Sequence, residues 1–109
     1  MNTENNNTEL DGSAQQKFDS KRVRELIWKT SLTANEKLVL LAIAELSDDD
    51  DGVCVATRQK IATMCGLSDG SAVSRVTTSV SKKGCLVVVQ GSKSDIGSQL
   101  PNTYKITIS

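Results

Sequence analysis

The pattern of apolar and polar positions separates a polar start from a foldable remainder. Residues 1–18 are rich in Asn, Thr, Gln and Ser and offer almost no apolar side chain for burial. Such a segment cannot offset the entropy that it would lose on ordering. We therefore expect a disordered polar tail over 1–18 and one domain over 19–109. A binding role for this tail is an alternative that the composition does not favour.

A first helix is predicted from about Lys21 to Ser31, with Asp19 or Ser20 as its N-cap. Apolar residues recur there at helical spacing, namely Val23, Leu26 and Ile27, with Trp28 adding bulk.

A second helix is predicted after the T-x-x-E sequence of Thr33–Glu36, which is typical of a capping box. The following residues, KLVLLAIAEL, are apolar on nearly every side, so this helix is expected to be central and covered by several neighbours. The run Asp48–Asp51 and Gly52 then predict a turn. Consecutive acidic residues lack the alternating spacing of a calcium loop, so a solvated turn is favoured over a metal site.

A short strand is predicted at Val53–Val55, followed by a helix with Thr57 as its N-cap. Gly66 would end this helix, because glycine adopts the left-handed conformation at little cost. Leu67 would hold the turn against the core. The inner face of the helix is predicted to carry Ile61, Met64 and Cys65.

Another helix should have Ser68 or Asp69 as its N-cap and end at Lys82-Lys83-Gly84. Its inner stripe is predicted to be Val73, Val76 and Val80. At about 100° per residue, the opposite face carries Ser71, Ser74, Arg75, Thr78 and Lys82.

Two strands are predicted at the C-terminal end, Cys85–Gln90 and Thr103–Ile108, around a turn-rich loop. In the second strand one face would carry Tyr104, Ile106 and Ile108. The predicted fold is therefore α+β and mostly α, with three to four helices and a C-terminal β-hairpin. A helix, a tight glycine turn, a second helix and a hairpin follow one another in a winged helix-turn-helix, which presents one helix to the DNA major groove.

The chain has no net charge, but its charges are unevenly distributed. Seven basic and two acidic residues follow Gly52, whereas six basic and eleven acidic residues precede Val53. A basic half is typical of a side that faces a polyanion. Chance asymmetry is the alternative, because Asp48–Asp51 supplies much of the acidity.

Chemistry that would indicate an enzyme is not visible in the sequence. The chain has no histidine, and the spacing of Cys54, Cys65 and Cys85 fits neither a zinc motif nor a disulfide framework. We interpret the three cysteines as small, partly buried apolar residues. No glycine-rich segment has P-loop spacing. A non-enzymatic protein without metal, cofactor or small-molecule ligand is expected.

No apolar run approaches the roughly 18 residues needed to span a bilayer, and MNTENNNTEL lacks a signal-peptide pattern. A cytoplasmic location, without a membrane partner, is expected.

Four segments together carry a family resemblance: LTANEKLVLLAIAELSDDDDGVC, IATMCGLS, VSRVTTSVSKKGCLVV and NTYKITI. In this order and spacing, over roughly 70% of the chain from Leu32 to Ile108, they resemble the winged helix-turn-helix modules of phage and plasmid replication initiators and related transcriptional regulators. The resemblance implies sequence-specific binding of double-stranded DNA through a recognition helix at about 69–83 and the hairpin wing. The origin-binding module of a mobile-element replication initiator is the favoured role. A small repressor is the alternative.

Arg75 is the best candidate for reading bases, because its guanidinium group can donate two hydrogen bonds to guanine. Short hydroxyl side chains that permit close approach are Ser71, Ser74 and Thr78, and Lys82 would contact the DNA backbone. Backbone phosphates could also meet the start of the preceding helix and the wing, at Thr57, Arg58, Gln59 and Lys93.

The segment Ser68–Ser71 carries no basic residue, and in the wing Lys93 is opposed by Asp95. A single domain should therefore bind weakly and lose affinity steeply with salt. Homodimers or several copies on repeated sites are expected. The alternative hypothesis, from a different functional class, is a winged-helix module that binds another protein and does not bind DNA.

Overall fold

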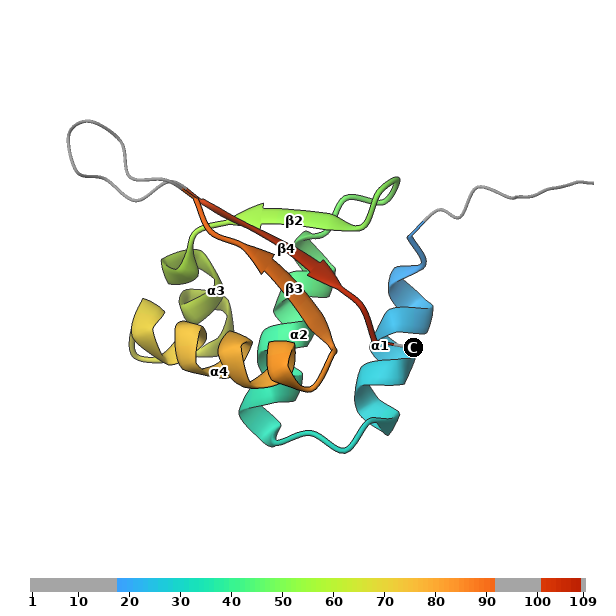
Figure 1. Ribbon diagram of the computed structural model, residues 1–109, viewed down its shortest axis with the longest axis horizontal. Helices are drawn as coiled ribbons and strands as arrows, with labels where there is room; N and C mark the ends of the chain where they lie inside the picture. The colour runs from blue at the N-terminus through green and yellow to red at the C-terminus, as the bar shows by residue number, and fades with distance from the viewer. Residues whose placement is uncertain (1–17, 92–100, 109) are drawn as a thin grey trace, which may run out of the picture.

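The computed structural model describes residues 18–91 and 101–108, with four α-helices and three β-strands in those ranges (Figure 1). The elements are, in chain order, α1 (Ser20–Lys29), α2 (Ala34–Leu46), β2 (Val53–Ala56), α3 (Arg58–Cys65), α4 (Gly70–Lys82), β3 (Leu86–Val89) and β4 (Asn102–Ile106). The predicted α+β class, rich in helix and ending in a pair of antiparallel strands, is confirmed.

Local capping chemistry defines the helix starts. The Asp19 side chain accepts a hydrogen bond from the Arg22 backbone N–H, so α1 begins at Ser20. The predicted capping box of α2 is confirmed: the Thr33 hydroxyl accepts from the Glu36 N–H at 3.2 Å, and a Glu36 carboxylate oxygen accepts from the Thr33 N–H at 2.8 Å. Each cap satisfies N–H groups that have no partner within the helix.

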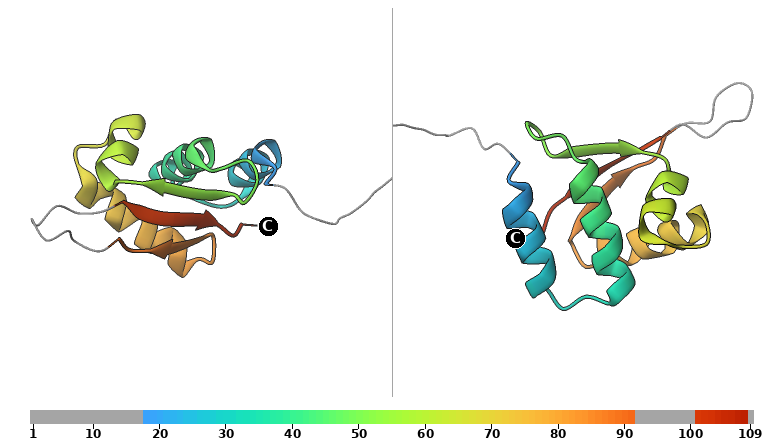
Figure 2. Two further views of the ribbon diagram at one scale, coloured as in Figure 1. Left: turned by 90° about the horizontal axis from the view of Figure 1, so that it is seen from above. Right: turned by 180° about the vertical axis from the view of Figure 1, so that it is seen from behind.

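β4 is the central strand of the antiparallel sheet, between β2 and β3. Tyr104 lies opposite Cys54 on one side and opposite Val88 on the other. Seen from above, the helices lie against one face of this sheet, and β2, β4 and β3 form the layer in front of them (Figure 2). The sheet therefore joins the middle of the chain to its C-terminal part.

The core lies between the sheet and the helices. Its fully buried large side chains come from every helix and from β2 and β4: Ile27, Val39, Leu40, Ile43, Cys54, Ile61, Val73, Val80 and Tyr104. The predicted burial of the cysteines is also confirmed, since Cys54 and Cys85 are buried and Cys65 is half-buried. Burial raises the pKa of the Cys54 thiol to about 11, which makes it a neutral apolar side chain.

Several details of the sequence interpretation are corrected. Met64 is 45% exposed and does not belong to the inner face of α3, where Ala62 is buried with Ile61. In α4 the buried stripe includes Thr77, while Val76 is only partly buried. These differences arise because burial depends on which neighbouring elements cover each helix, and a helical period alone does not specify that.

The boundaries at the two ends also differ from the predicted ones. α1 ends at Lys29, two residues before the predicted end, because Thr30 adopts an extended backbone conformation with a ψ of 145°. Phe18, counted with the predicted tail, is partly buried against the core and lies beside Gly52. The rest of the predicted tail, 1–17, lies outside the described residues.

The acidic segment after α2 forms a compact turn. The Asp48 carboxylate accepts from the Asp50 N–H at 2.8 Å, and the Asp51 carboxylate accepts from the Val53 N–H at 2.9 Å. Gly52 has a φ of +69° and closes the turn onto the Asp48 carbonyl. In the described ranges no group of three or more His, Cys, Asp or Glu side chains is placed to hold a metal ion.

Candidate nucleic-acid interface

α3 and α4 are joined by a short turn that the sequence defines locally. The Thr57 hydroxyl caps α3 by accepting from the Lys60 N–H at 3.1 Å. Gly66 ends α3 with a φ of +72°, and the Leu67 N–H returns to the Ala62 carbonyl at 2.9 Å. After this turn, the Asp69 carboxylate caps α4.

The first turns of α3 and α4 lie against each other. A Cβ atom added at Gly70 would lie 3.1 Å from the Arg58 Cβ, so the absence of a side chain at Gly70 permits this approach. The Arg58 guanidinium donates a hydrogen bond to the Ser74 hydroxyl at 2.7 Å. Beside this contact lies a hollow of about 330 Å³, lined by Thr57, Arg58, Gln59 and Gly70.

α4 has one buried face and one exposed polar face. Val73, Thr77 and Val80 are buried against the core. The exposed residues at i, i+4, i+7 and i+11 on the other side are Ser71, Arg75, Thr78 and Lys82. Within 18–91 and 101–108, no side-chain hydrogen bond or ion pair engages these four. A hydroxyl, a guanidinium, a second hydroxyl and an ammonium group thus point to solvent along one line.

The other sequence-predicted residues lie in different settings. Ser74 is half-buried at the flank of α4, where it bonds to Arg58. Gln59 is exposed, and its amide donates to the Thr63 hydroxyl at 3.4 Å. Lys93 lies outside the described residues. The structure therefore brings Thr57, Arg58 and Gln59 together with the start of α4, and leaves Arg75 and Lys82 on the exposed face.

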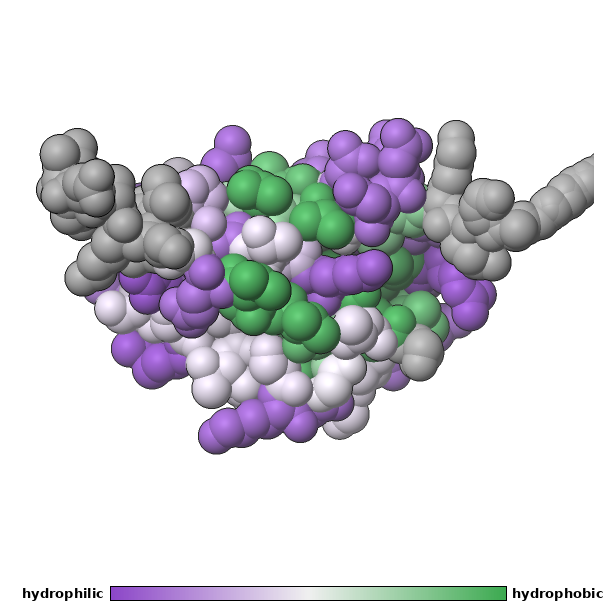
Figure 3. All heavy atoms as spheres, turned by 45° about the horizontal axis from the view of Figure 1, so that its top comes forward, coloured by the Kyte–Doolittle hydropathy of each residue, from purple (hydrophilic) through white to green (hydrophobic). Residues whose placement is uncertain are grey.

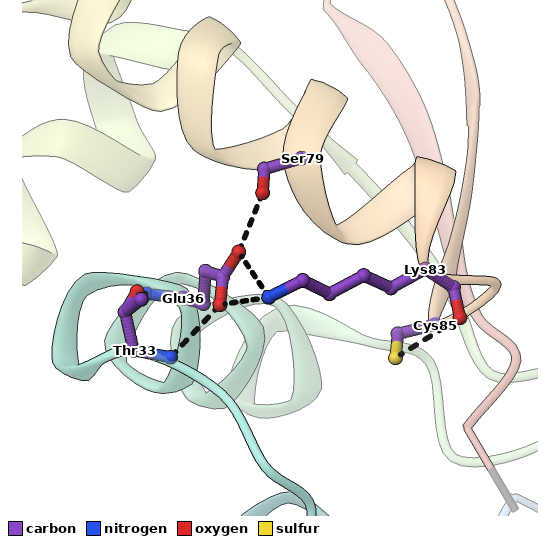
Figure 4. Close-up of polar contacts among 5 residues, drawn as sticks. All are labelled: Thr33, Glu36, Ser79, Lys83 and Cys85. Atoms are coloured by element: carbon purple, nitrogen blue, oxygen red, sulfur yellow. Dashed lines mark hydrogen bonds and ion pairs between the residues drawn. The ribbon is translucent and has the colours of Figure 1, made fainter.

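A buried carboxylate fixes the C-terminal end of α4 to α2 (Figure 4). Glu36 is 4% exposed, and its oxygens accept from the Ser79 hydroxyl at 2.6 Å and from the Lys83 ammonium at 2.8 and 3.0 Å. The bonds from Lys83, Ser79 and the Thr33 N–H lower the pKa of Glu36 to about 2. The carboxylate stays ionised and sets the position of α4 relative to α2.

A second buried polar contact lies where β3 and β4 leave the sheet. The Asn102 amide donates to the Tyr104 hydroxyl at 3.1 Å, and its oxygen accepts from the Gly91 N–H at 2.9 Å. Burial raises the pKa of Tyr104, so the hydroxyl remains neutral. Asn102 therefore joins the end of one strand to the start of the other at the base of the connection.

Sequence reasoning found the capping role of Glu36 but not its bonds to Ser79 and Lys83. An ionisable residue at the start of an otherwise apolar helix was the available signal, because a buried acid requires partners. The partners lie 43 and 47 residues further along the chain, and nothing local identifies them.

Within the described part of the chain, no helix has the length and apolar character needed to cross a membrane. Comparisons with models of protein families, with curated proteins and with solved structures find no match for this chain.

Proposed function

We propose that this chain is a winged helix-turn-helix protein that binds double-stranded DNA, with α4 as the recognition helix. The observation that carries the proposal is the exposed face of α4, where Ser71, Arg75, Thr78 and Lys82 are aligned and uncommitted to other described residues. The sheet order β2-β4-β3 and the α3–α4 turn support the same assignment. The sequence resemblance implies the element order that the chain has, namely α2, β2, α3, α4 and then the final pair of strands.

The chemistry of the α4 face suits a base edge flanked by phosphates. An α-helix fits the major groove, and a guanidinium can donate two hydrogen bonds to guanine O6 and N7. We assign this role to Arg75. Ser71 and Thr78 are short enough to let the helix backbone approach closely, and Lys82, at the end of the helix, would contact a phosphate.

The first turn of α3 would hold a second phosphate. Thr57 and Gln59 are exposed beside Arg58 at the helix N-terminus, where the helix dipole favours an anion. The Arg58 side chain donates one hydrogen bond to Ser74 and retains other N–H donors. Lys93 would add a backbone contact from the connection between β3 and β4.

We further propose that the DNA is the replication origin of a mobile element, with an operator as the alternative target. The resemblance to replication-initiator modules supports the first. The two roles use the same helix, so the arrangement of binding sites distinguishes them: iterated repeats indicate an origin, and a palindrome indicates an operator.

The test is selection of bound duplexes from a randomised DNA pool, followed by fluorescence anisotropy with the selected and scrambled duplexes at two salt concentrations. Arg75→Ala should lower affinity for the selected site by about 1–3 kcal/mol and reduce specificity. Lys82→Ala should weaken binding to both duplexes. It should also reduce the slope of log binding constant against log salt concentration by about 1. Arg22→Ala, an exposed arginine of α1, is the matched control and should bind like the wild type.

Absence of binding to any duplex at low salt, with a folded sample, would overturn the proposal. A protein-binding module would then be favoured, because Trp28, Leu38 and Met64 are exposed apolar side chains of a kind that interfaces use.

A further inference from the structure

The outer side of α2 is not fully covered by the rest of the chain. The sequence predicts a helix buried by several neighbours, yet Leu38 is 45% exposed and Leu41 is only partly buried. With Trp28, Leu32, Ala34 and Lys37, these residues line a hollow of about 480 Å³ between the C-terminal end of α1 and the N-terminal half of α2. We call this hollow the α1–α2 groove. Viewed from behind, α2 lies at the front of the molecule beside α1 (Figure 2).

The groove has an aromatic rim that is held in place. Trp28 is 63% exposed. The Lys37 ammonium lies 5.6 Å from the centre of the Trp28 ring and donates to the Trp28 carbonyl at 3.0 Å. These contacts restrain a large apolar side chain at the surface, so it would lose little conformational freedom on contact with a partner.

The stripe of α2 that borders the groove has symmetrically placed charges. Ala34, Leu38, Leu41 and Glu45 follow one another at spacings of four, three and four residues and therefore lie on one face. Lys37 precedes Leu41 by four residues, and Glu45 follows it by four. Two such helices packed antiparallel across Leu41 would place each Lys37 beside Glu45 of the other copy.

We propose that the α1–α2 groove binds a second copy of this chain in a twofold dimer centred on Leu41. A twofold interface uses the same patch on both copies, which therefore must be self-complementary. The Lys37 and Glu45 positions meet this requirement. The antiparallel arrangement also brings the acidic turn after α2 of one copy toward Lys29 and Lys37 of the other.

The other exposed apolar surface fits a second copy less well. On the open face of the sheet Val55 is 64%, Val87 51% and Val89 61% exposed. Figure 3 shows hydrophobic surface on this side in separate patches with hydrophilic and neutral atoms between them. Lys105 lies opposite Val87 in the register, in the middle of this face, and the strands contribute no acidic residue to oppose it. Packing of two such faces would bring lysines together.

The dimer does not depend on DNA binding, so it is tested without DNA. The experiment is sedimentation equilibrium of the full chain over a broad concentration range, with circular dichroism to verify folding. The wild type should associate reversibly to a dimer. Lys37→Glu and Glu45→Lys should each raise the dimer dissociation constant about tenfold or more, because each variant faces like charges with itself.

Mixing the two charge variants provides the decisive measurement. One copy then carries acidic groups at both positions and the other carries basic groups, so the mixture should form a heterodimer although each variant alone is mainly monomeric. Loss of folding cannot produce this rescue. Val87→Ala on the sheet is the matched control, and its dissociation constant should equal that of the wild type.

Three results would overturn the proposal. These are a wild type that stays monomeric at every concentration, charge variants that sediment as two monomers when mixed, and a Val87→Ala variant whose dimer dissociation constant rises as much as that of Lys37→Glu. The last result would place the interface on the sheet.

Discussion

The Lys83 ammonium lies 2.8 Å from the Glu36 carboxylate and so joins the end of α4 to the first turn of α2. Glu36 is buried, whereas the Lys83 side chain is 44% exposed and keeps part of its hydration. The position of the exposed α4 face therefore depends on a carboxylate that lies on another helix.

The stability of the fold should depend on the ionisation of Glu36. Its pKa is about 2 in the folded chain against 4.5 for a free carboxyl, so the unfolded chain binds the proton at higher pH. This contribution is fully present above about pH 4.5 and is lost as the pH falls toward 2. Glu36→Gln should lower the unfolding free energy at neutral pH by about 1–3 kcal/mol and remove much of this acid dependence.

Urea unfolding of both proteins at a series of pH values measures the effect. Glu25→Gln, a change at an exposed position of α1, should follow the wild type. Equal pH dependence in wild type and Glu36→Gln would contradict the role given to Glu36.

Gly66 should be needed for its backbone conformation alone. Its φ is +72°, and an added Cβ would meet no atom within 4 Å. Gly66→Ala should therefore cost about 1–2 kcal/mol through the left-handed conformation rather than through a clash. Gly66→Asn should cost less, because asparagine tolerates this region. Thermal unfolding compares the two, and equal losses would argue against a conformational cause.

Asp69 is expected to have opposite effects on stability and on DNA binding. Its carboxylate accepts from the Ala72 N–H at 3.1 Å and caps α4, but it also places a negative charge at the proposed DNA face. Asp69→Asn keeps a capping oxygen and should leave stability nearly unchanged while raising DNA affinity. Asp69→Ala should cost about 1 kcal/mol of stability. Chemical denaturation and anisotropy at one salt concentration separate the two effects, and unchanged affinity in Asp69→Asn would exclude this end of α4 from the interface.

Tyr104→Phe should destabilise the sheet without a change of packing. The substitution removes the hydroxyl that accepts from Asn102, which is 4% exposed, and leaves a buried amide donor without that partner. We expect a loss of about 1–3 kcal/mol in unfolding free energy. The double variant Tyr104→Phe/Asn102→Ala tests the coupling, because purely additive losses would show that the hydrogen bond contributes little.

The predictable parts of the fold are those that local chemistry determines. Thr33 and Thr57 were predicted as caps because a hydroxyl and the N–H three residues later form a contact within one turn. The buried positions Val73 and Val80 follow from helical spacing. Exposure of Met64 and burial of Thr77 depend on which neighbours cover each helix, and this is a property of the assembled domain.

The candidate interface likewise has features that the sequence predicts and features that only the folded domain determines. The exposure of Arg75 and Lys82 was predicted from periodicity and is confirmed, whereas their contact with DNA stays a prediction. Ser74 was placed on the same face but turns toward Arg58, a residue 16 positions earlier. Helical periodicity predicts which face of the helix carries a residue. Whether a side chain near the border of that face points to solvent or to a neighbouring helix depends on how the helices pack.

The central position of β4 has a consequence for biosynthesis. β2 and β3 pair only through β4, which follows all the other described elements in the chain. During translation both outer strands keep unpaired backbone N–H and C=O groups until Asn102–Ile106 leaves the ribosome, although all residues of the four helices have already been synthesised. Such edges invite pairing with other chains. Slow synthesis of the chain between Val89 and Ile106 would therefore prolong an aggregation-prone state, which ends once β4 enters the sheet.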